Sequence, residues 1–270
     1  MSPIFVMGDI HGHYDRMIEV LRDDAQLIRR DLTWIGGEAT VCFLGDYFDR
    51  GPDGIRVVDF LISLEIQAEM NGGKVISLLG NHDVFIMAAQ RFGTRQGTSG
   101  GRGNFYEDWR HMGGVMRDLE SLTPEHIAWL TNLPALALLE DRVMAHADSL
   151  FYMRYGSTLE EINAHFVALL RGYDFRAWDR LLNDFSDRYA FMDKDGYGDP
   201  TTDGVTNAER FMEAFGGRQI LHGHTPIFRV TGQAPERVTE PYLYAEGLCM
   251  NFDPGMYAGG PGFIYELPSL

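Results

Sequence analysis

Five short strings along this 270-residue chain concentrate aspartate, asparagine and histidine, the side chains that bind divalent cations. The first three are GDIHG (8–12), GDYFDRG (45–51) and GNHD (80–83), and MAHAD (144–148) and HGHTP (222–226) follow. Two neighbouring cations could share one bridging carboxylate from this set, and Asp46 suits that bridge. The proposed ligands are two carboxylates, one carboxamide and three imidazoles: Asp9, His11, Asp46, Asn81, His146 and His224.

The strings are too specific to reflect loop composition alone. A chosen tetrapeptide such as GNHD occurs by chance in about one chain in a thousand of this length. Gly, Asp and Asn are common in turns, but turn chemistry does not explain why histidines lie in the same strings. Because the donors are oxygen and nitrogen without thiolate, we expect two divalent ions, manganese first, with iron and zinc as alternatives.

Composition limits the partners and the location. The formal charge of −16 would repel a nucleic-acid backbone, so we expect no nucleic-acid partner, although two bound cations would still admit phosphorylated substrates. No apolar run is long enough to span a membrane. Cys42 and Cys249 are the only cysteines, and each lies in an apolar run, which favours a reducing compartment. We therefore expect a cytoplasmic protein, since removal of a leader peptide would destroy the first string.

The first three strings each follow an apolar run that could position them. PIFVMG (3–8), TVCFLG (40–45) and KVISLLG (74–80) predict strands. Helical spacing covers residues 14–30, a segment that begins at Pro52, and residues 81–90. This alternation predicts a parallel sheet with helices on its faces, and ligands bind such sheets beyond the carboxyl ends of the strands.

The rest of the chain predicts a second sheet within one domain spanning residues 1–270. A helix is expected over 122–134, with Thr123 as its N-cap, and the glycine- and arginine-rich segment 91–105 is either a linker or a substrate-contacting lid. DKDG (193–196) lacks the context of a nucleophile or calcium loop and is interpreted as a solvated turn. The expected strands lie in ALALL (135–139), RVMAHA (142–147), QILHGHTPIF (219–228), YLYAEGLCMNFDPG (242–255) and GFIYEL (262–267).

Three residues beside the ligands could perform chemistry on a phosphate. Arg50 could hold a phosphate oxygen through its planar guanidinium, or it could form a surface ion pair with Asp49 or Asp53. His82 could donate a proton to the departing oxygen, with Asp49 raising its pKa, or it could be a helix-start histidine satisfied by the backbone. His222 is a secondary candidate that could face the site or pack beneath it.

Taken together, these strings resemble the calcineurin-like metallophosphoesterases. The closer resemblance is to the phosphoprotein phosphatase branch, whose bacterial and phage members include phage lambda phosphatase, and it covers residues 4 to about 265. It implies an α/β four-layer sandwich in which two mixed β-sheets are flanked by helices. The same resemblance implies a dinuclear site built from the six ligands above, Arg50 and Asn81 on phosphate, and His82 as acid paired with Asp49.

Other strings extend the resemblance and show where it departs from the family. WDR (178–180) is similar to a Trp-x-Arg string and implies Arg180 as a second phosphate-binding arginine. WRHMGG (109–114) resembles a substrate-side string within a lid segment at 91–120, and NFDPG (251–255) resembles a turn that closes the site. Asp83 replaces a glutamate of the pattern, HADSLF replaces HGG, and residues 183–216 form a variable insertion.

The function implied is a metal-dependent phosphomonoesterase of the serine/threonine protein phosphatase type. It would hydrolyse a phosphorylated protein or a small phosphoester by in-line attack of a metal-bridging hydroxide, without a phosphoenzyme. Hydrolysis of dinucleoside polyphosphates such as diadenosine tetraphosphate is the alternative within the same machinery. A non-catalytic binding module is a third hypothesis, but such a protein would be expected to have lost a ligand, Arg50 or His82.

Overall fold

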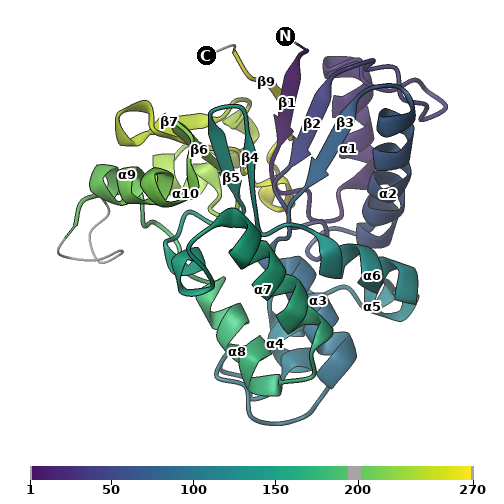
Figure 1. Ribbon diagram of the computed structural model, residues 1–270. Coiled ribbons are helices and arrows are strands. Elements are labelled where there is room, and N and C mark those ends of the chain that lie inside the picture. The colour runs from purple at the N-terminus through teal and green to yellow at the C-terminus, as the bar shows by residue number, and fades with distance from the viewer. Residues whose placement is uncertain (1, 194–201, 269–270) are drawn as a thin grey trace.

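The computed structural model describes residues 2–193 and 202–268, and two facing β-sheets form its centre (Figure 1). In the first sheet β1 (Ile4–Met7), β2 (Thr40–Phe43) and β3 (Lys74–Ser77) run parallel, and β9 (Tyr265–Glu266) pairs antiparallel with β1. The strand order is β3-β2-β1-β9. The predicted β-α-β alternation and parallel sheet are confirmed.

The second sheet has the order β4-β5-β6-β8-β7. Its strands β5 (Arg142–Ala145), β6 (Gln219–His222) and β8 (Cys249–Asn251) run parallel, while β4 (Leu136–Leu139) and β7 (Tyr242–Tyr244) are antiparallel edge strands. Both sheets are therefore mixed, and the two-sheet architecture with flanking helices is the one expected.

Alternation along the strands explains how the sheets pack. One face of each sheet contributes Val6, Cys42, Met144, Leu221 and Met250 to the core between the sheets. The opposite face of the first sheet carries Val41 and Phe43 into a larger core with the helices. Both cysteines are buried and free.

Helices cover the outer faces and extend below the sheets. Strands β1, β2 and β3 are followed along the chain by α1 (Tyr14–Glu19), α2 (Gly54–Met70) and α3 (Asn81–Phe92). Figure 1 shows a lower helical region that contains α3, α4 (Phe105–His111), α7 (Leu159–Arg171) and α8 (Phe175–Asp184). Within the described ranges, no helix combines the length and the apolar character needed to cross a membrane. The remaining helices are α5 (Met116–Ser121), α6 (Pro124–Asn132), α9 (Gly204–Phe215) and α10 (Ile227–Thr231).

Several boundaries differ from those predicted. The helix expected over 14–30 ends in a π-helical segment, Val20–Asp24, and Ile28 instead forms a bridge with Trp34. The strand expected over 219–228 ends at His222, and Ile227 and Phe228 instead begin a short helix, Ile227–Thr231, with Pro226 at its N-cap. The expected lid at 91–120 contains α4 and α5, and the insertion at 183–216 contains α9. Most of DKDG (193–196) lies outside the described residues.

Candidate metal centre

The predicted ligands converge where the two sheets meet. Asp9, Asp46 and Asn81 follow β1, β2 and β3, whereas His146 and His224 follow β5 and β6. All of them are buried. The carboxyl ends of parallel strands thus bring residues from five separate strings to one place, as expected for α/β sheets.

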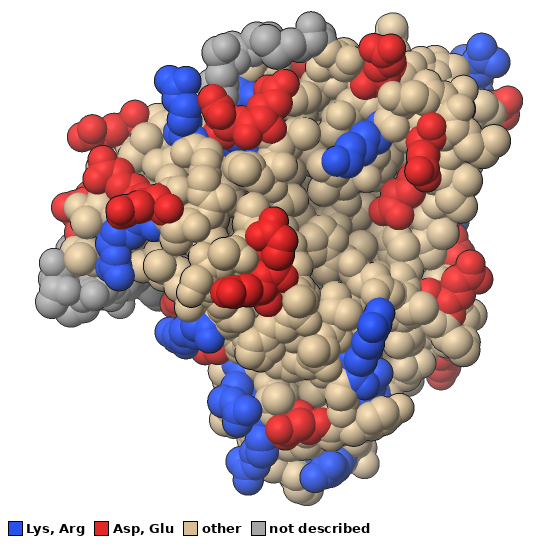
Figure 2. Space-filling model, in the orientation of Figure 1, with Lys and Arg blue, Asp and Glu red and all other residues tan. Residues whose placement is uncertain are grey.

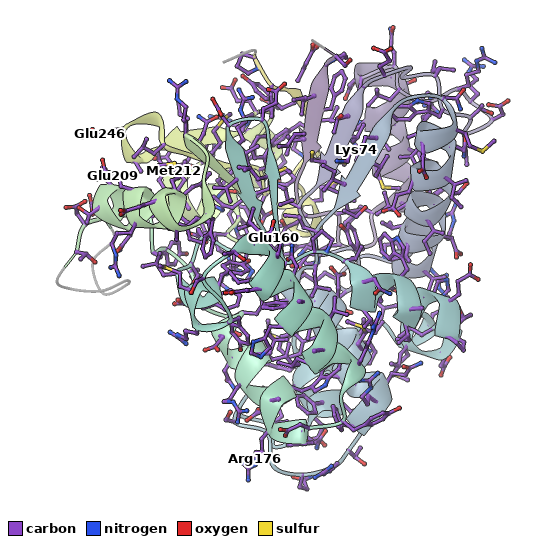
Figure 3. All side chains as sticks on the ribbon, viewed as in Figure 1. Lys74, Glu160, Arg176, Glu209, Met212 and Glu246 are labelled. Carbon is purple, nitrogen blue, oxygen red and sulfur yellow. The ribbon has the colours of Figure 1, made fainter. Side chains whose placement is uncertain are left out.

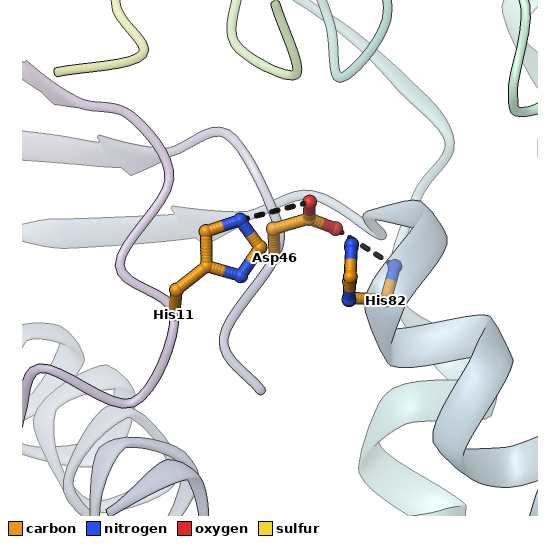
Figure 4. Close-up of side chains that lie close together, drawn as sticks. All are labelled: His11, Asp46 and His82. Carbon is orange, nitrogen blue, oxygen red and sulfur yellow. Dashed lines mark hydrogen bonds and ion pairs between the residues drawn. The ribbon is translucent and has the colours of Figure 1, made fainter. Parts of the chain in front are cut away.

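Two overlapping sets of donor atoms share one carboxylate. His11, Asp46 and His82 form one set, and Asp46, His146 and His224 form the other, with the donor atoms of each set lying within 4.8 Å of one another. Figure 4 shows Asp46 between His11 and His82; its Oδ2 lies 3.6 Å from His11 Nε2, and its Oδ1 accepts the backbone N–H of His82 at 2.9 Å. This position suits a carboxylate that bridges two cations.

Hydrogen bonds to the backbone orient two of the histidines for metal binding. His11 Nδ1 lies 2.9 Å from the carbonyl oxygen of Phe48, and His146 Nδ1 lies 2.8 Å from that of Leu44. Because a carbonyl oxygen only accepts, Nδ1 carries a proton in both rings, and Nε2 is the ring atom that faces Asp46. Each ring is therefore oriented so that Nε2 could bind a metal. In His146 burial is outweighed by Asp46, which raises the pKa to about 10, so a metal there would displace the Nε2 proton.

Unpartnered buried atoms provide a test of whether a metal fits. Asn81 Oδ1 lies 3.0 Å from His146 Nε2 and 2.9 Å from His224 Nδ1. His224 Nε2 and Asp253 Oδ2 are buried without a hydrogen-bond partner among the described residues. Such atoms are costly unless they coordinate a ligand. The donor set therefore fits divalent cations.

Buried carboxylates reinforce this conclusion. Burial and the nearby Asp253 raise the pKa of Asp9 well above its usual value, and burial raises the pKa of Asp253 to about 6. For Asp46 burial acts in the same direction, but His146 and His82 outweigh it and lower the pKa. Bound cations would relieve this concentration of negative charge.

Asp83 organises the ligand loops rather than binding metal. Its carboxylate accepts the backbone N–H groups of Gly80, Asp46 and Tyr47 at 2.8–3.0 Å, and burial raises its pKa to about 8. Asp83, which replaces the glutamate of the family pattern, therefore contacts the backbone of the loops that carry the proposed ligands.

Asp49, Arg50 and His82 form a connected group beside the ligands. His82 Nδ1 lies 2.8 Å from Asp49 Oδ2, and Trp109 Nε1 donates to Asp49 Oδ1 at 2.7 Å. The Arg50 guanidinium lies 2.9 Å from both His11 Nε2 and His82 Nε2 and stacks on Tyr257. Arg50 therefore points into the site rather than forming the surface ion pair with Asp53.

The prediction that Asp49 raises the pKa of His82 is wrong, because that pKa is lowered. Burial lowers it to about 3, and the positive charges of Arg50, His146 and Arg188 act in the same sense, although Asp46 opposes them. Asp49 is itself buried, and burial raises its pKa well above the usual range. Asp49 thus holds the ring of His82 in place but does not keep it protonated.

Arg180, the second arginine predicted to bind phosphate, and the secondary candidate His222 lie away from the cluster. Arg180 is exposed on α8, where its charge acts on Tyr155. Arg188, which follows the end of α8, is the arginine whose charge acts on both His82 and His224. His222 is buried, with Nδ1 2.9 Å from the Gly223 carbonyl and Nε2 2.7 Å from the Tyr244 hydroxyl, so it packs beneath the site.

Asp253, Tyr257 and Arg188 were not predicted as site residues. Asp253 follows β8 as Asp9 follows β1, and this equivalence, together with the string NFDPG, was the signal available in the sequence. Tyr257 and Arg188 lie in segments without periodicity, so their positions could come only from the structure.

The comparison with known families identifies the class of this fold and site. A family model described as calcineurin-like phosphoesterase matches residues 2–228, and the chain belongs to this family. A Shewanella-like protein phosphatase 2 of Arabidopsis thaliana is 31% identical over 117 residues, covering 43% of this chain and 29% of that protein. A symmetrical bis(5'-nucleosyl)-tetraphosphatase of an Enterobacter species is 29% identical over 155 residues, covering 53% of this chain and 42% of that protein.

The fold as a whole is shared with solved phosphatases. A cold-active protein-tyrosine phosphatase of a psychrophilic Shewanella species superimposes with a TM-score of 0.68 at 23% identity, covering 100% of this chain and 76% of that chain. The chain spans less than half the length of the two curated relatives above. These similarities support the α/β metallophosphoesterase architecture.

Proposed function

We propose that this protein is a dinuclear metal-dependent phosphomonoesterase acting on phosphoserine and phosphothreonine in proteins and on small phosphoesters. The observation that carries the proposal is Asp46, which is shared by two sets of metal donors and lies beside the Asp49–His82 pair and Arg50. The related protein phosphatases support it. We also propose a cytoplasmic location, because both cysteines are free.

The residues that would hold two cations divide around Asp46. Asp9 and His11 would complete one site, and Asn81, His146 and His224 the other. We propose manganese, since the set contains prominent oxygen donors, with iron and zinc as alternatives. Bound cations of this kind activate water as a nucleophile and neutralise phosphate charge.

The remaining side chains would orient the phosphate and manage the proton of the leaving group. The positive charges of Arg50 and Arg188 both act on His82, and Arg50 is additionally oriented by Tyr257. Because these arginines depress the pKa of His82, a phosphate dianion that engages them would raise that pKa again. His82, held by Asp49, would then donate its proton to the departing alkoxide.

Hydrolysis of dinucleoside polyphosphates is the second candidate, supported by the related tetraphosphatase. The arginines at 91–105 could have held additional phosphates, but in the structure they have other contacts. Arg91 donates to the carbonyl oxygens of Leu170 and Gly172, Arg95 lies over Phe175, and Arg102 contacts His111. These contacts favour the monoesterase.

The test is hydrolysis of p-nitrophenyl phosphate, a phosphoserine peptide and diadenosine tetraphosphate by chelator-treated protein, with and without manganese, iron or zinc. We expect manganese to restore activity on the first two substrates. Asp46→Asn is the matched control, because it should lose both the activity and retention of metal. Metal-dependent cleavage of diadenosine tetraphosphate alone would favour the second candidate, and no cleavage of any substrate would refute the proposal.

A further inference from the structure

A large groove lies between the edge strands of the two sheets, away from the proposed ligands. It measures about 900 Å³ and is lined by β3 and β4 together with residues of α2, α6 and α7. Its apolar lining includes Val75, Trp129, Leu133 and Leu138, and Leu138 is 44% exposed. Figure 2 shows this face from outside, with a mostly uncharged hollow near its centre.

The outer edge of β3 presents backbone groups to this groove. Lys74 and Leu78 donate their N–H groups to Ala39 and Phe43 on the side of β2. Because alternate residues of a parallel strand face opposite neighbours, the N–H and C=O groups of Val75 and Ser77 point toward the groove. An edge strand of this kind is a template for pairing with another extended chain.

At the floor of the groove, a backbone group that follows β3 on its outer edge already forms a hydrogen bond with another segment of the chain. The N–H of Leu79, next in the alternation, donates to the Pro134 carbonyl at 3.0 Å. On the facing edge, the carboxamide of Asn163 accepts from Leu136 N–H at 3.1 Å and donates to Leu136 C=O at 2.9 Å, as a neighbouring peptide would. Beyond these contacts the groove is lined by the half-buried Val75 and the exposed Leu138, with the buried Ser77 at its base.

The charges around the groove indicate the chemistry of its occupant. Glu65, Glu125 and Glu160 are among the lining residues, and Lys74 is the one cation among them. Glu65 accepts hydrogen bonds from Ser77 Oγ at 2.8 Å and Trp129 Nε1 at 2.9 Å, and burial raises its pKa. In Figure 3 Lys74 lies on β3 and Glu160 lies at the start of α7. A cation in the groove would stabilise these carboxylates.

We propose that this groove binds an extended, basic peptide segment of a partner protein. The segment adds as a strand to the outer edge of β3, pairing with the backbone of Val75 and Ser77. Its apolar side chains, at alternate positions, pack against Trp129 and Leu138, and its Lys or Arg side chains face Glu125 and Glu160. The groove thereby recruits protein partners independently of the metal cluster.

The test uses fluorescein-labelled peptides of about ten residues, a typical upper length for a strand. One alternates Val and Lys, a second alternates Val and Glu, and a third replaces the intervening residues of the first with Pro to remove donors. We expect fluorescence anisotropy to show micromolar binding of the first peptide, at least about tenfold weaker binding of the others, and no dependence on metal.

Protein variants locate the binding site. Val75→Pro removes an outward donor but no bond to β2, and edge strands tolerate proline at such positions. We expect it, Leu138→Ser and the double variant Glu125→Lys/Glu160→Lys each to weaken binding of the Val/Lys peptide at least about tenfold. Glu209→Lys on α9, away from the groove in Figure 3, is the control for a charge reversal outside the groove and should bind normally.

Unchanged melting temperature and unchanged hydrolysis of p-nitrophenyl phosphate would show that the variants are folded. Equal binding of all three peptides, unaltered binding by the groove variants, or no binding at millimolar concentration would overturn the proposal. Sedimentation of the wild type and of Val75→Pro provides a further test. A wild-type dimer that Val75→Pro dissociates would assign the groove to a second copy of this chain and would overturn the peptide proposal.

Discussion

The loops that follow the first sheet and those that follow the second hold the proposed metal ligands in place through different contacts. In the first sheet, Asp46, Asp49 and Arg50 lie in one loop with positive φ angles, supported by the carboxylate of Asp83. In the second, Asp148 accepts the Thr225 hydroxyl at 2.7 Å and the N–H of Tyr189 at 2.8 Å, which ties the His224 loop to the segment carrying Arg188.

Each sheet therefore contributes one buried carboxylate that binds loops instead of metal. Asp83 joins its own string to the Asp46 loop, 36–37 residues earlier, by accepting backbone N–H groups only, whereas Asp148 joins the Tyr189 segment to the hydroxyl of Thr225, 77 residues after Asp148. The comparison teaches that the first half holds four of the six proposed ligands and the proposed proton donor, while the second half supplies His146, His224 and the segment of Arg188. Variants in the two halves should differ accordingly.

The largest effect is expected for His82→Ala in the first half. The variant should retain both metals and lose about 10²–10⁴-fold in kcat on a phosphoserine peptide, because the departing alkoxide needs a proton. The loss should be smaller on p-nitrophenyl phosphate, whose leaving group needs little protonation. Equal losses on the two substrates would show that His82 is not the general acid.

Replacing Arg50 or Arg188 should give the next largest effect. Because Arg50 lies in the first half of the chain and Arg188 in the second, these two variants compare the halves directly. Arg50→Ala and Arg188→Ala should each raise KM and lower kcat/KM about 10–100-fold, the loss expected for a hydrogen bond to a charged group. Arg180→Ala, on the exposed face of α8, is the control and should leave both constants unchanged. A loss for Arg180→Ala equal to that for Arg188→Ala would reverse the assignment made from the structure.

The two organising carboxylates should give smaller and distinguishable effects. Asp83→Asn should weaken metal binding about 10–100-fold, since it disturbs the backbone of the bridging ligand. Asp148→Asn should act mainly on KM, through the segment that carries Arg188. Metal titration followed by steady-state kinetics separates these outcomes, and identical profiles would mean that the halves are not organised independently.

The smallest effect concerns Asp118, outside the cluster. It accepts the N–H groups of Gly54 and Ile55 at the start of α2, and burial raises its pKa to about 6. A carboxyl with a raised folded pKa contributes stability that is complete at low pH and is lost as pH rises from about 4 through 6. Urea unfolding should therefore show that the stability of wild type relative to Asp118→Asn falls over this range, and a rising difference would contradict the prediction.

The sequence predicted the first half of the site better than the second. Strings that close successive parallel strands predicted that Asp9, Asp46 and Asn81 lie together, because strand order determines where such residues meet. Arg180 was selected from a tripeptide whose orientation on α8 could not be read from the pattern. The pKa of His82 was misjudged because burial, which no local string reveals, outweighs the nearby charge.

The left-handed backbone of the site has a consequence for how such proteins diverge. His11, Asp46, Asp49, Arg50 and His224 all have φ between 47° and 69°, a conformation that costs a residue with a side chain about 1 kcal/mol or more and costs glycine little. The proposed chemistry requires these side chains despite that cost. A descendant released from such selection would gain stability by drifting to glycine at these positions, so glycine there would mark a relative that has kept the fold and lost the chemistry.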